Sequence, residues 1–268
     1  MQKEMCCFPD FEKPPLVEVV CGVLFDDVKE LLVPHFGQLW ERFKPEYVAC
    51  QERPPIAPVF ENNASELTIE FSNIPPLPRI WFVRQDGNGI IQVQRDRFLY
   101  NWRQTRPSDE YPRYHTVINS FNAHFSKFQE FITSTALGEV RPLQYEMTYV
   151  NHVPFGKDGV NRGIGRILPD CAWRALPERF LPEIEGFIWN PVFRLPDENG
   201  RLHVKAQVVI RANDNMPILL LEITARGIGT DRSIEGMQAW FDLAREWIVR
   251  GFADLTGSDI QDEWGRKA

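Results

Sequence analysis

Arginine and aromatic side chains alternate between residues 79 and 114, the segment with the most unusual composition in the chain. Seven arginines stand there against four acidic residues. The aromatic residues among them include Trp81, Phe98, Tyr100, Trp102, Tyr111 and Tyr114. Guanidinium groups bind phosphates and aromatic rings stack on bases, so this pattern is typical of nucleotide or single-stranded nucleic-acid recognition. The residues that would bind such a ligand are Arg95, Arg97, Trp102 and Arg103.

The same pattern also arises in a strand whose aromatic side chains face the core and whose arginines face water. Phe98, Tyr100 and Trp102 share one parity, as that arrangement requires. The formal net charge of −7 also disfavours a protein that works by neutralising phosphates. We therefore expect Trp102 to be a core residue. Another protein or a second copy of this chain is the favoured partner, and nucleic acid is the less favoured one.

Polar residues on a second strand form the other candidate site. The segment from Leu143 to Val153 alternates as a strand does and carries Glu146, Asn151 and His152. If Arg95 and Arg97 face the same surface of the sheet, an Arg–Glu network results. Such a network either stabilises the fold or binds a ligand. An enzyme with acid–base groups at Glu146 and His152 remains a third alternative.

Motifs that would identify a reaction are absent from the sequence. There is no phosphate-binding loop of the GxxxxGK[ST] type, no GxSxG and no HExxH. Gly163 and Gly165 lack the third glycine of a dinucleotide fingerprint, and the five histidines show no metal-ligand spacing. His124 is expected to have a structural role. We expect no metal, no cofactor and a non-enzymatic protein.

Residues 90–132 predict a long strand that leads directly into an amphipathic helix. Ile91 and Val93 have one parity, whereas the aromatic residues from Phe98 onward have the other. A β-bulge within residues 95–97 would explain this switch, because one extra residue turns every later side chain to the opposite face. The helix carries an apolar stripe at spacings of three and four, formed by Ile118, Phe121, Phe125, Phe128 and Ile132.

The order of predicted elements repeats along the chain. After an N-terminal arm (residues 1–15), residues 16–137 and 138–268 each predict a strand, a helix, three strands and a long helix. The three strands of each half are expected at 67–71, 79–84 and 90–102, and at 186–195, 202–211 and 218–226. The last helix is expected at 233–255, with Gly257 as its C-cap. These patterns predict an α+β fold with antiparallel sheets, long helices packed on them, and one compact unit.

The composition is that of a globular protein. Hydrophobic residues make up 43% of the 268 residues, and no apolar run is long enough for a signal peptide or a membrane span. The five cysteines are odd in number and show no CxxC spacing, which favours reduced thiols. The sequence therefore predicts a cytoplasmic protein that does not bind membranes.

Three segments carry a resemblance to a known family. They are the opening PPLVEVVCGVLF, the run QRDRFLYNWR followed by YPRY, and LQYEMTYVNHV. Together they resemble a sporadically distributed family of uncharacterised bacterial proteins. The resemblance brings no catalytic residues, and the patchy distribution suggests accessory genes with roles in stress response or phage defence. From the residues and the resemblance together, we expect a binding or protein-interaction protein.

Overall fold

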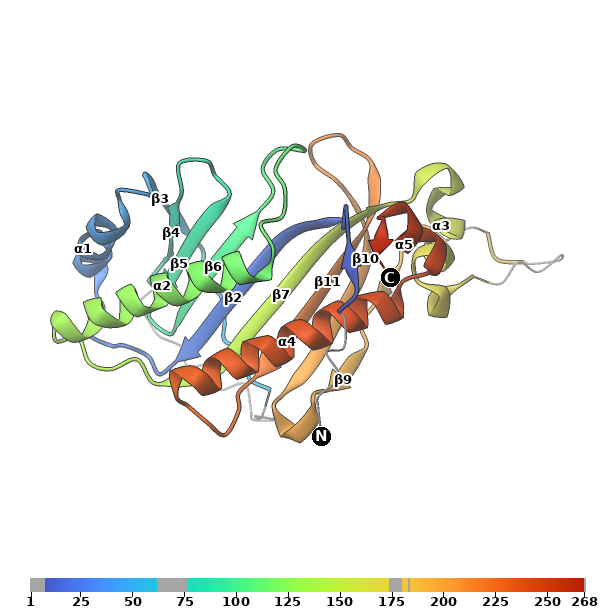
Figure 1. Ribbon diagram of the computed structural model, residues 1–268. Helices are drawn as coiled ribbons and strands as arrows, with labels where there is room; N and C mark the ends of the chain where they lie inside the picture. The colour runs from blue at the N-terminus through green and yellow to red at the C-terminus, as the bar shows by residue number, and fades with distance from the viewer. Residues whose placement is uncertain (1–7, 62–76, 174–179, 183, 268) are drawn as a thin grey trace.

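The fold is built on one large antiparallel sheet, and two long helices lie across one of its faces (Figure 1). The computed structural model describes residues 8–61, 77–173, 180–182 and 184–267. The predicted α+β class, with antiparallel strands and long helices packed on them, is confirmed.

The sheet has the strand order β3-β4-β5-β6-β2-β7-β11-β10-β8, and β9 also pairs with β10. Its strands are β2 (Leu16–Phe25), β3 (Ala49–Arg53), β4 (Arg79–Val83), β5 (Gly89–Gln94), β6 (Arg97–Arg103), β7 (Pro142–Pro154), β8 (Ile188–Trp189), β9 (Val192–Arg194), β10 (Arg201–Ile210) and β11 (Pro217–Gly227). A separate pair joins β1 (Asp10–Phe11) to β12 (Arg266–Lys267), so residues near the two ends of the chain lie side by side.

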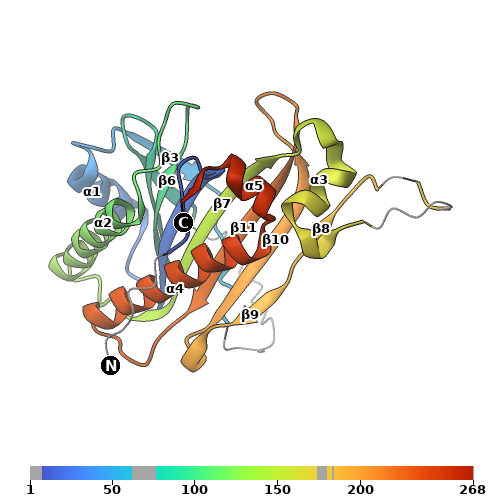
Figure 2. The ribbon, with the colours of Figure 1, turned by 45° about the vertical axis from the view of Figure 1, so that its right-hand side comes forward.

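The helices are α1 (Val33–Phe43), α2 (Tyr114–Ser134), α3 (Gly159–Ile167), α4 (Ile234–Leu255) and α5 (Ser258–Glu263). Helix α2 packs on β6 and β2, whereas α4 packs on β7, β11 and β10. Figure 2 shows α1 at one end of the sheet and α3 at the other. Within the described part of the chain, no helix has both the length and the apolar character that a membrane span requires.

The two predicted halves share one topology and one sheet. In the first half, the opening strand β2 pairs with the last strand β6, and β5 and β4 follow outward. In the second half, the opening strand β7 pairs in the same way with β11, and β10 follows outward. Strands β2 and β7 pair with each other at the centre, so the halves meet there. Both halves follow the predicted order of a strand, a helix, further strands and a long helix, but each has four described strands between its helices instead of the three predicted.

The predicted bulge within residues 95–97 is wrong. The strand expected over 90–102 is a hairpin, in which β5 and β6 are joined by a two-residue turn at Arg95 and Asp96. Gln94 pairs with Arg97 and Val93 with Phe98, so residues of opposite parity share a face without a bulge. Neither turn residue has a positive φ, so the turn needs no glycine and leaves no glycine signal.

Other expected boundaries also shift. Strand β3 is not among the predicted strands, whereas the strand expected at 67–71 lies outside the described residues. The strand expected at 186–195 is two short strands, β8 and β9, separated at Pro191. A loop over residues 104–113 separates β6 from α2, so the strand does not lead directly into the helix. Gly257 is the N-cap of α5 and not the C-cap of α4, which is Thr256.

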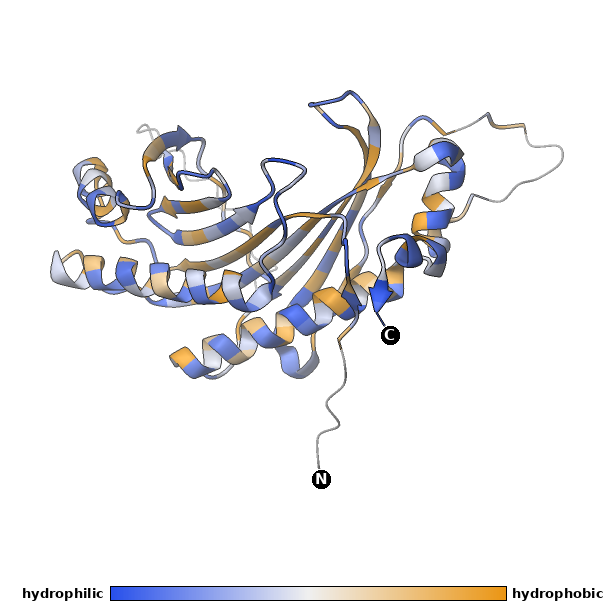
Figure 3. Cartoon of the chain, turned by 45° about the horizontal axis from the view of Figure 1, so that its top comes forward, coloured by the Kyte–Doolittle hydropathy of each residue, from blue (hydrophilic) through white to orange (hydrophobic). Residues whose placement is uncertain are grey.

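Aromatic side chains fill the core between the sheet and the long helices. Phe98 on β6 contacts Phe121, Phe125 and Phe128 of α2, with ring centroids 6.4, 5.6 and 5.2 Å apart. Figure 3 shows hydrophobic and hydrophilic residues alternating along both long helices. Apolar residues at helical spacing along α4 are also buried: Met237, Phe241, Ala244, Ile248 and Leu255.

The opposite face of the sheet, which we call the helix-free face, is polar but largely buried. Residues 54–61 cross it as an extended strap. The side-chain amide of Gln94 bonds both backbone groups of Ile56, and that of Gln144 bonds Glu61 N and Val59 O. At the end of the strap, the Glu61 carboxylate pairs with His203 at 2.6 Å and with Arg201 at 3.4 Å. The strap therefore links β5, β7 and β10 across the sheet.

Candidate ligand-binding pocket

A pocket of about 430 Å³ lies above the centre of the sheet, between α2, α4 and the N-terminal residues. Most of its wall is apolar, and its volume is within the usual range for small-molecule sites. Its apolar lining includes Phe8, Phe11, Pro14, Leu16, Ile223, Ile248, Val249 and Phe252.

The N-terminal residues form one wall because they are fastened to the end of the chain. Strand β1 pairs with β12, and Glu12 and Lys13 donate backbone hydrogen bonds to Gly265 and Trp264. The Phe11 ring packs edge-on against Phe252 and Trp264. The pocket wall is therefore an ordered part of the fold.

Two tyrosines, the half-buried Tyr111 and the buried Tyr149, line the pocket. The Tyr111 and Tyr149 hydroxyls lie 3.0 Å apart and share one hydrogen bond. Burial raises the pKa of Tyr111 to about 12 and raises that of Tyr149 well above its ordinary value. Both phenols are therefore protonated at neutral pH, and the shared bond leaves one hydroxyl proton for a ligand.

Asn151 lies beside these tyrosines on β7. Its side-chain nitrogen donates to the Leu221 backbone carbonyl at 3.1 Å, which fixes the orientation of the amide. The amide oxygen can accept a hydrogen bond from a ligand. Asn151 is 4% exposed, so such a bond would form away from bulk water.

Cationic side chains stand at the start of α2 and along α4. The Arg245 guanidinium stacks on the rings of Phe8 and Tyr114, with centroid distances of 4.6 and 4.7 Å. It forms no ion pair among the described residues, whereas Arg113 pairs with Asp10 at 2.8 Å. Arg113 also has a φ of 70°, which non-glycine residues rarely adopt and which often marks functional sites.

Of the predicted site residues, the structure brings Asn151 to this pocket and Trp102 close to it. Trp102 is 4% exposed and packs on the ring of Tyr111 at 5.3 Å, so it is a core residue, as expected. The apolar alternation of the strand was the signal that identified it.

The other predicted residues lie elsewhere. Arg97, Arg103, Glu146 and His152 face the helix-free side of the sheet, because their pairing partners alternate with the core residues. Arg95 lies in the β5–β6 turn and pairs with Asp27 at 3.3 Å. The Arg–Glu network expected between these strands does not form, since Glu146 pairs instead with Arg226 on β11 at 2.6 Å.

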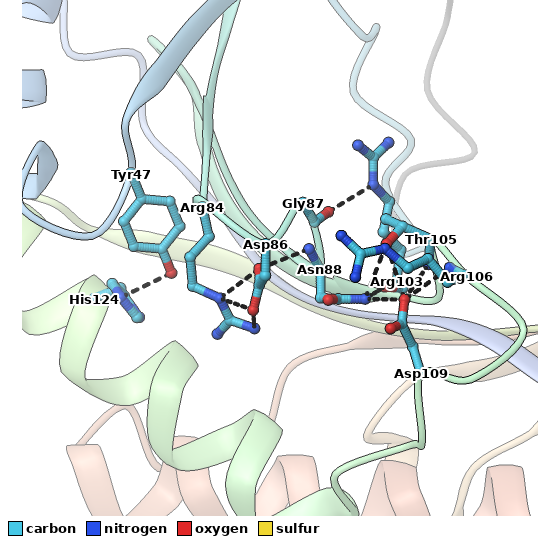
Figure 4. Close-up of polar contacts among 10 residues, drawn as sticks. All are labelled: Tyr47, Arg84, Asp86, Gly87, Asn88, Arg103, Thr105, Arg106, Asp109 and His124. Atoms are coloured by element: carbon cyan, nitrogen blue, oxygen red, sulfur yellow. Dashed lines mark hydrogen bonds and ion pairs between the residues drawn. The ribbon is translucent and has the colours of Figure 1, made fainter.

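A polar cluster around the β4–β5 hairpin has a structural role (Figure 4). The Asn88 side chain donates to Arg103 O and to the Asp109 carboxylate, both at 2.8 Å. The hydrogen bond from Asn88 and those from the loop backbone lower the pKa of Asp109. Nearby, His124 bonds the Tyr47 hydroxyl and stacks on Tyr100, and burial lowers its pKa. These contacts hold the hairpin, the loop before α2 and the helix together.

No metal centre is evident among the described residues, where no group of three His, Cys, Asp or Glu side chains converges. Sequence reasoning missed Arg245 as a pocket residue, because a single arginine on a helix carries no motif. It also missed the wall formed by the N-terminal residues, which depends on contacts with the far end of the chain.

No protein-family model matches this chain, and a search of curated proteins finds no match either.

Proposed function

We propose that this protein binds a small, mostly apolar molecule in the pocket between the N-terminal residues, α2 and α4. The observation that carries the proposal is the pocket itself: it combines an apolar wall with a few fixed polar groups. Such a combination is typical of ligand sites, in which the apolar wall supplies affinity and the polar groups supply orientation.

The polar groups define the chemistry of the ligand. Tyr111, Tyr149 and Asn151 suit a hydroxyl, carbonyl or amide group on the buried part of the molecule. Arg245 suits a carboxylate or another acidic group, because its stacked guanidinium keeps its in-plane N–H donors for an oxyanion. The proposed ligand is therefore an apolar or aromatic acid.

Tyr111 and Tyr149 are suited to hydrogen bonding with a ligand and not to acting as general bases at neutral pH. A general base must be deprotonated near neutral pH, whereas burial raises the pKa of both Tyr111 and Tyr149. The accessory role in stress response or phage defence rests on the family resemblance alone. The cytoplasmic location fits the free thiols of Cys21, Cys50 and Cys171.

The fluorescent probe anilinonaphthalene sulfonate tests the proposal, because it is an aromatic acid of suitable size. We expect saturable binding by the folded protein and roughly tenfold weaker binding after Val249→Trp, which fills the pocket. Ile234→Trp is the matched control, since Ile234 lies on the same helix and is 74% exposed. Equal binding by both variants would contradict the proposal.

A second variant tests the acidic group. Arg245→Gln should weaken binding of an aromatic carboxylic acid and leave binding of the corresponding neutral amide unchanged. Circular dichroism and thermal unfolding establish that each variant is folded. If Arg245→Gln weakens binding of the acid and of the amide by the same factor, Arg245 shapes the pocket and does not recognise the acidic group.

A further inference from the structure

Arginines from three strands gather on the helix-free face of the sheet, opposite the pocket. Arg53 on β3 pairs directly with Arg79 on β4, and Arg97 lies on β6. Burial lowers the pKa of Arg79, and the positive charges of Arg97 and Arg53 lower it further, so the three side chains are within electrostatic reach. This concentration of like charge is unfavourable unless an anion compensates it.

Trp81 provides a platform for this cluster. The guanidinium groups of Arg53, Arg79 and Arg103 lie 4.7, 5.4 and 5.9 Å from the centre of its ring. In the described part of the chain these three arginines have neutral hydrogen-bond acceptors and no carboxylate partner: Arg53 donates to Gln51 Oε1 and Glu52 O, Arg79 to Gln92 Oε1, and Arg103 to Gly87 O. A guanidinium that stacks by its face keeps N–H donors at its edge, which is the geometry that binds oxyanions.

Arg97 adds a second, independent observation. It is 5% exposed, and its Nε and one terminal nitrogen, Nη2, are buried without a hydrogen bond. Asp96 lies 3.5 Å from Nε but does not bond it in hydrogen-bond geometry. The Nε of Arg79 is also buried without a hydrogen bond. Buried charged donors without partners are costly, so these nitrogens are suited to bind an oxyanion.

Neutral amides complete the surroundings. Gln92 Oε1 accepts from Arg79 at 2.7 Å and from the Trp81 ring nitrogen at 2.9 Å. Gln92 in turn donates to Asn101, whose amide bonds the Glu18 carboxylate at 2.6 Å. Glu18 is thus engaged with Asn101, and Asp96 accepts from Gln94 at 2.9 Å. Glu18 and Asp96 are therefore engaged with amides, and neither forms an ion pair with Arg53 or Arg79 among the described residues.

We propose that Arg53, Arg79 and Arg97 form a second binding site, which takes a phosphate group. The guanidinium groups of Arg53 and Arg79 beside the Trp81 ring, with Arg97 within electrostatic reach of Arg79, suit the charge and the several acceptor oxygens of phosphate. The phosphate is free, part of a nucleotide, or part of a single-stranded nucleic acid, and all three sources share this chemistry. A base attached to the phosphate would contact Trp81, since Trp102 lies on the opposite face of the sheet. This site does not depend on the proposed pocket.

Calorimetric titration with inorganic phosphate, adenosine monophosphate and a short oligothymidylate tests the site in the full-length protein. We expect at least one probe to bind, with an affinity that falls as salt increases. Arg53→Gln and Arg79→Gln should each weaken that binding by roughly tenfold. The matched control is Arg141→Gln, because Arg141 is exposed and pairs only with Glu139 among the described residues.

The probes also separate the three sources. Equal affinity for phosphate and the nucleotide indicates a free anion, whereas tighter nucleotide binding that Trp81→Leu abolishes indicates a stacked base. Preference for the oligonucleotide with a steeper salt dependence indicates a nucleic acid. If no probe binds, or if Arg53→Gln and Arg79→Gln bind as tightly as the control while remaining folded, the proposal is overturned. Arg53 and Arg79 are only half-buried, so these variants are expected to fold.

Discussion

The hydroxyl groups of Tyr111 and Tyr149 lie 3.0 Å apart, although 38 residues separate them in the chain. Tyr111 precedes α2 and Tyr149 lies on the central strand β7, so the bond joins the two halves of the protein. It also places both hydroxyls in the proposed ligand pocket. The geometry of the pocket therefore depends on how the halves dock.

A double-mutant cycle measures this contact. Tyr111→Phe and Tyr149→Phe each remove one hydroxyl, and the pair should show a coupling free energy of about 1 kcal/mol, since each single variant leaves the other hydroxyl without its partner. Urea unfolding of the four proteins gives the value. Strictly additive effects would mean that the two hydroxyls do not interact in solution.

Phe241→Ala should lower the free energy of unfolding by about 3 to 5 kcal/mol, because it removes a fully buried ring. The ring contacts Phe121 at 5.1 Å and Tyr145 at 5.8 Å, so it couples both long helices to the sheet. Ile234→Ala, at an exposed position on the same helix, should change stability little. A loss below about 1 kcal/mol for Phe241→Ala would mean that α4 is peripheral.

Trp102→Ala should also lower stability by about 3 to 5 kcal/mol, since Trp102 is buried on the helix side of the sheet. At the same time it should leave the affinity for the phosphate probes unchanged in any protein that remains folded. If a folded Trp102→Ala protein lost phosphate binding, the phosphate site would lie on the helix side of the sheet, and the proposed site would be incorrect. Thermal unfolding and calorimetry supply the two measurements.

The strap should make stability depend on acid pH. Although burial acts to raise the pKa of Glu61, hydrogen bonds from His203 and Arg201 lower it below its ordinary value of 4.5. A carboxyl whose pKa is lower in the folded state stabilises the fold above its unfolded pKa, and this contribution is lost as pH falls through the folded pKa. Stability should therefore decline below about pH 4.5.

Glu61→Gln identifies the source of that decline. The variant keeps the shape of the side chain but cannot titrate, so its unfolding free energy should depend less on pH below the unfolded pKa of glutamate. The comparison is made by urea unfolding at a series of acidic pH values. An identical pH dependence in both proteins would assign the effect to other carboxyls.

Local periodicity predicted most of the elements. The apolar spacing from Ile118 to Ile132 predicts α2, and the strict alternation from Leu143 predicts β7, because each pattern depends only on the geometry of its own element. The change of apolar parity after Val93 is real, but its cause is a hairpin turn and not the predicted bulge. A two-residue turn and a bulge both exchange the faces, and only the pairing of Val93 with Phe98 distinguishes them.

The candidate sites required the tertiary structure. The sequence indicated Asn151 and the arginines of residues 79–114, but not which of them share a face. Asn151, Arg245 and Phe11 line one pocket because distant segments of the chain pack around it. Arg53 lies opposite Arg79 because β3 pairs with β4. The spacing of side chains along the chain determines which face of a single helix or strand each side chain occupies. The register between strands and the docking of helices arise from the packing of the whole core, which no local pattern records.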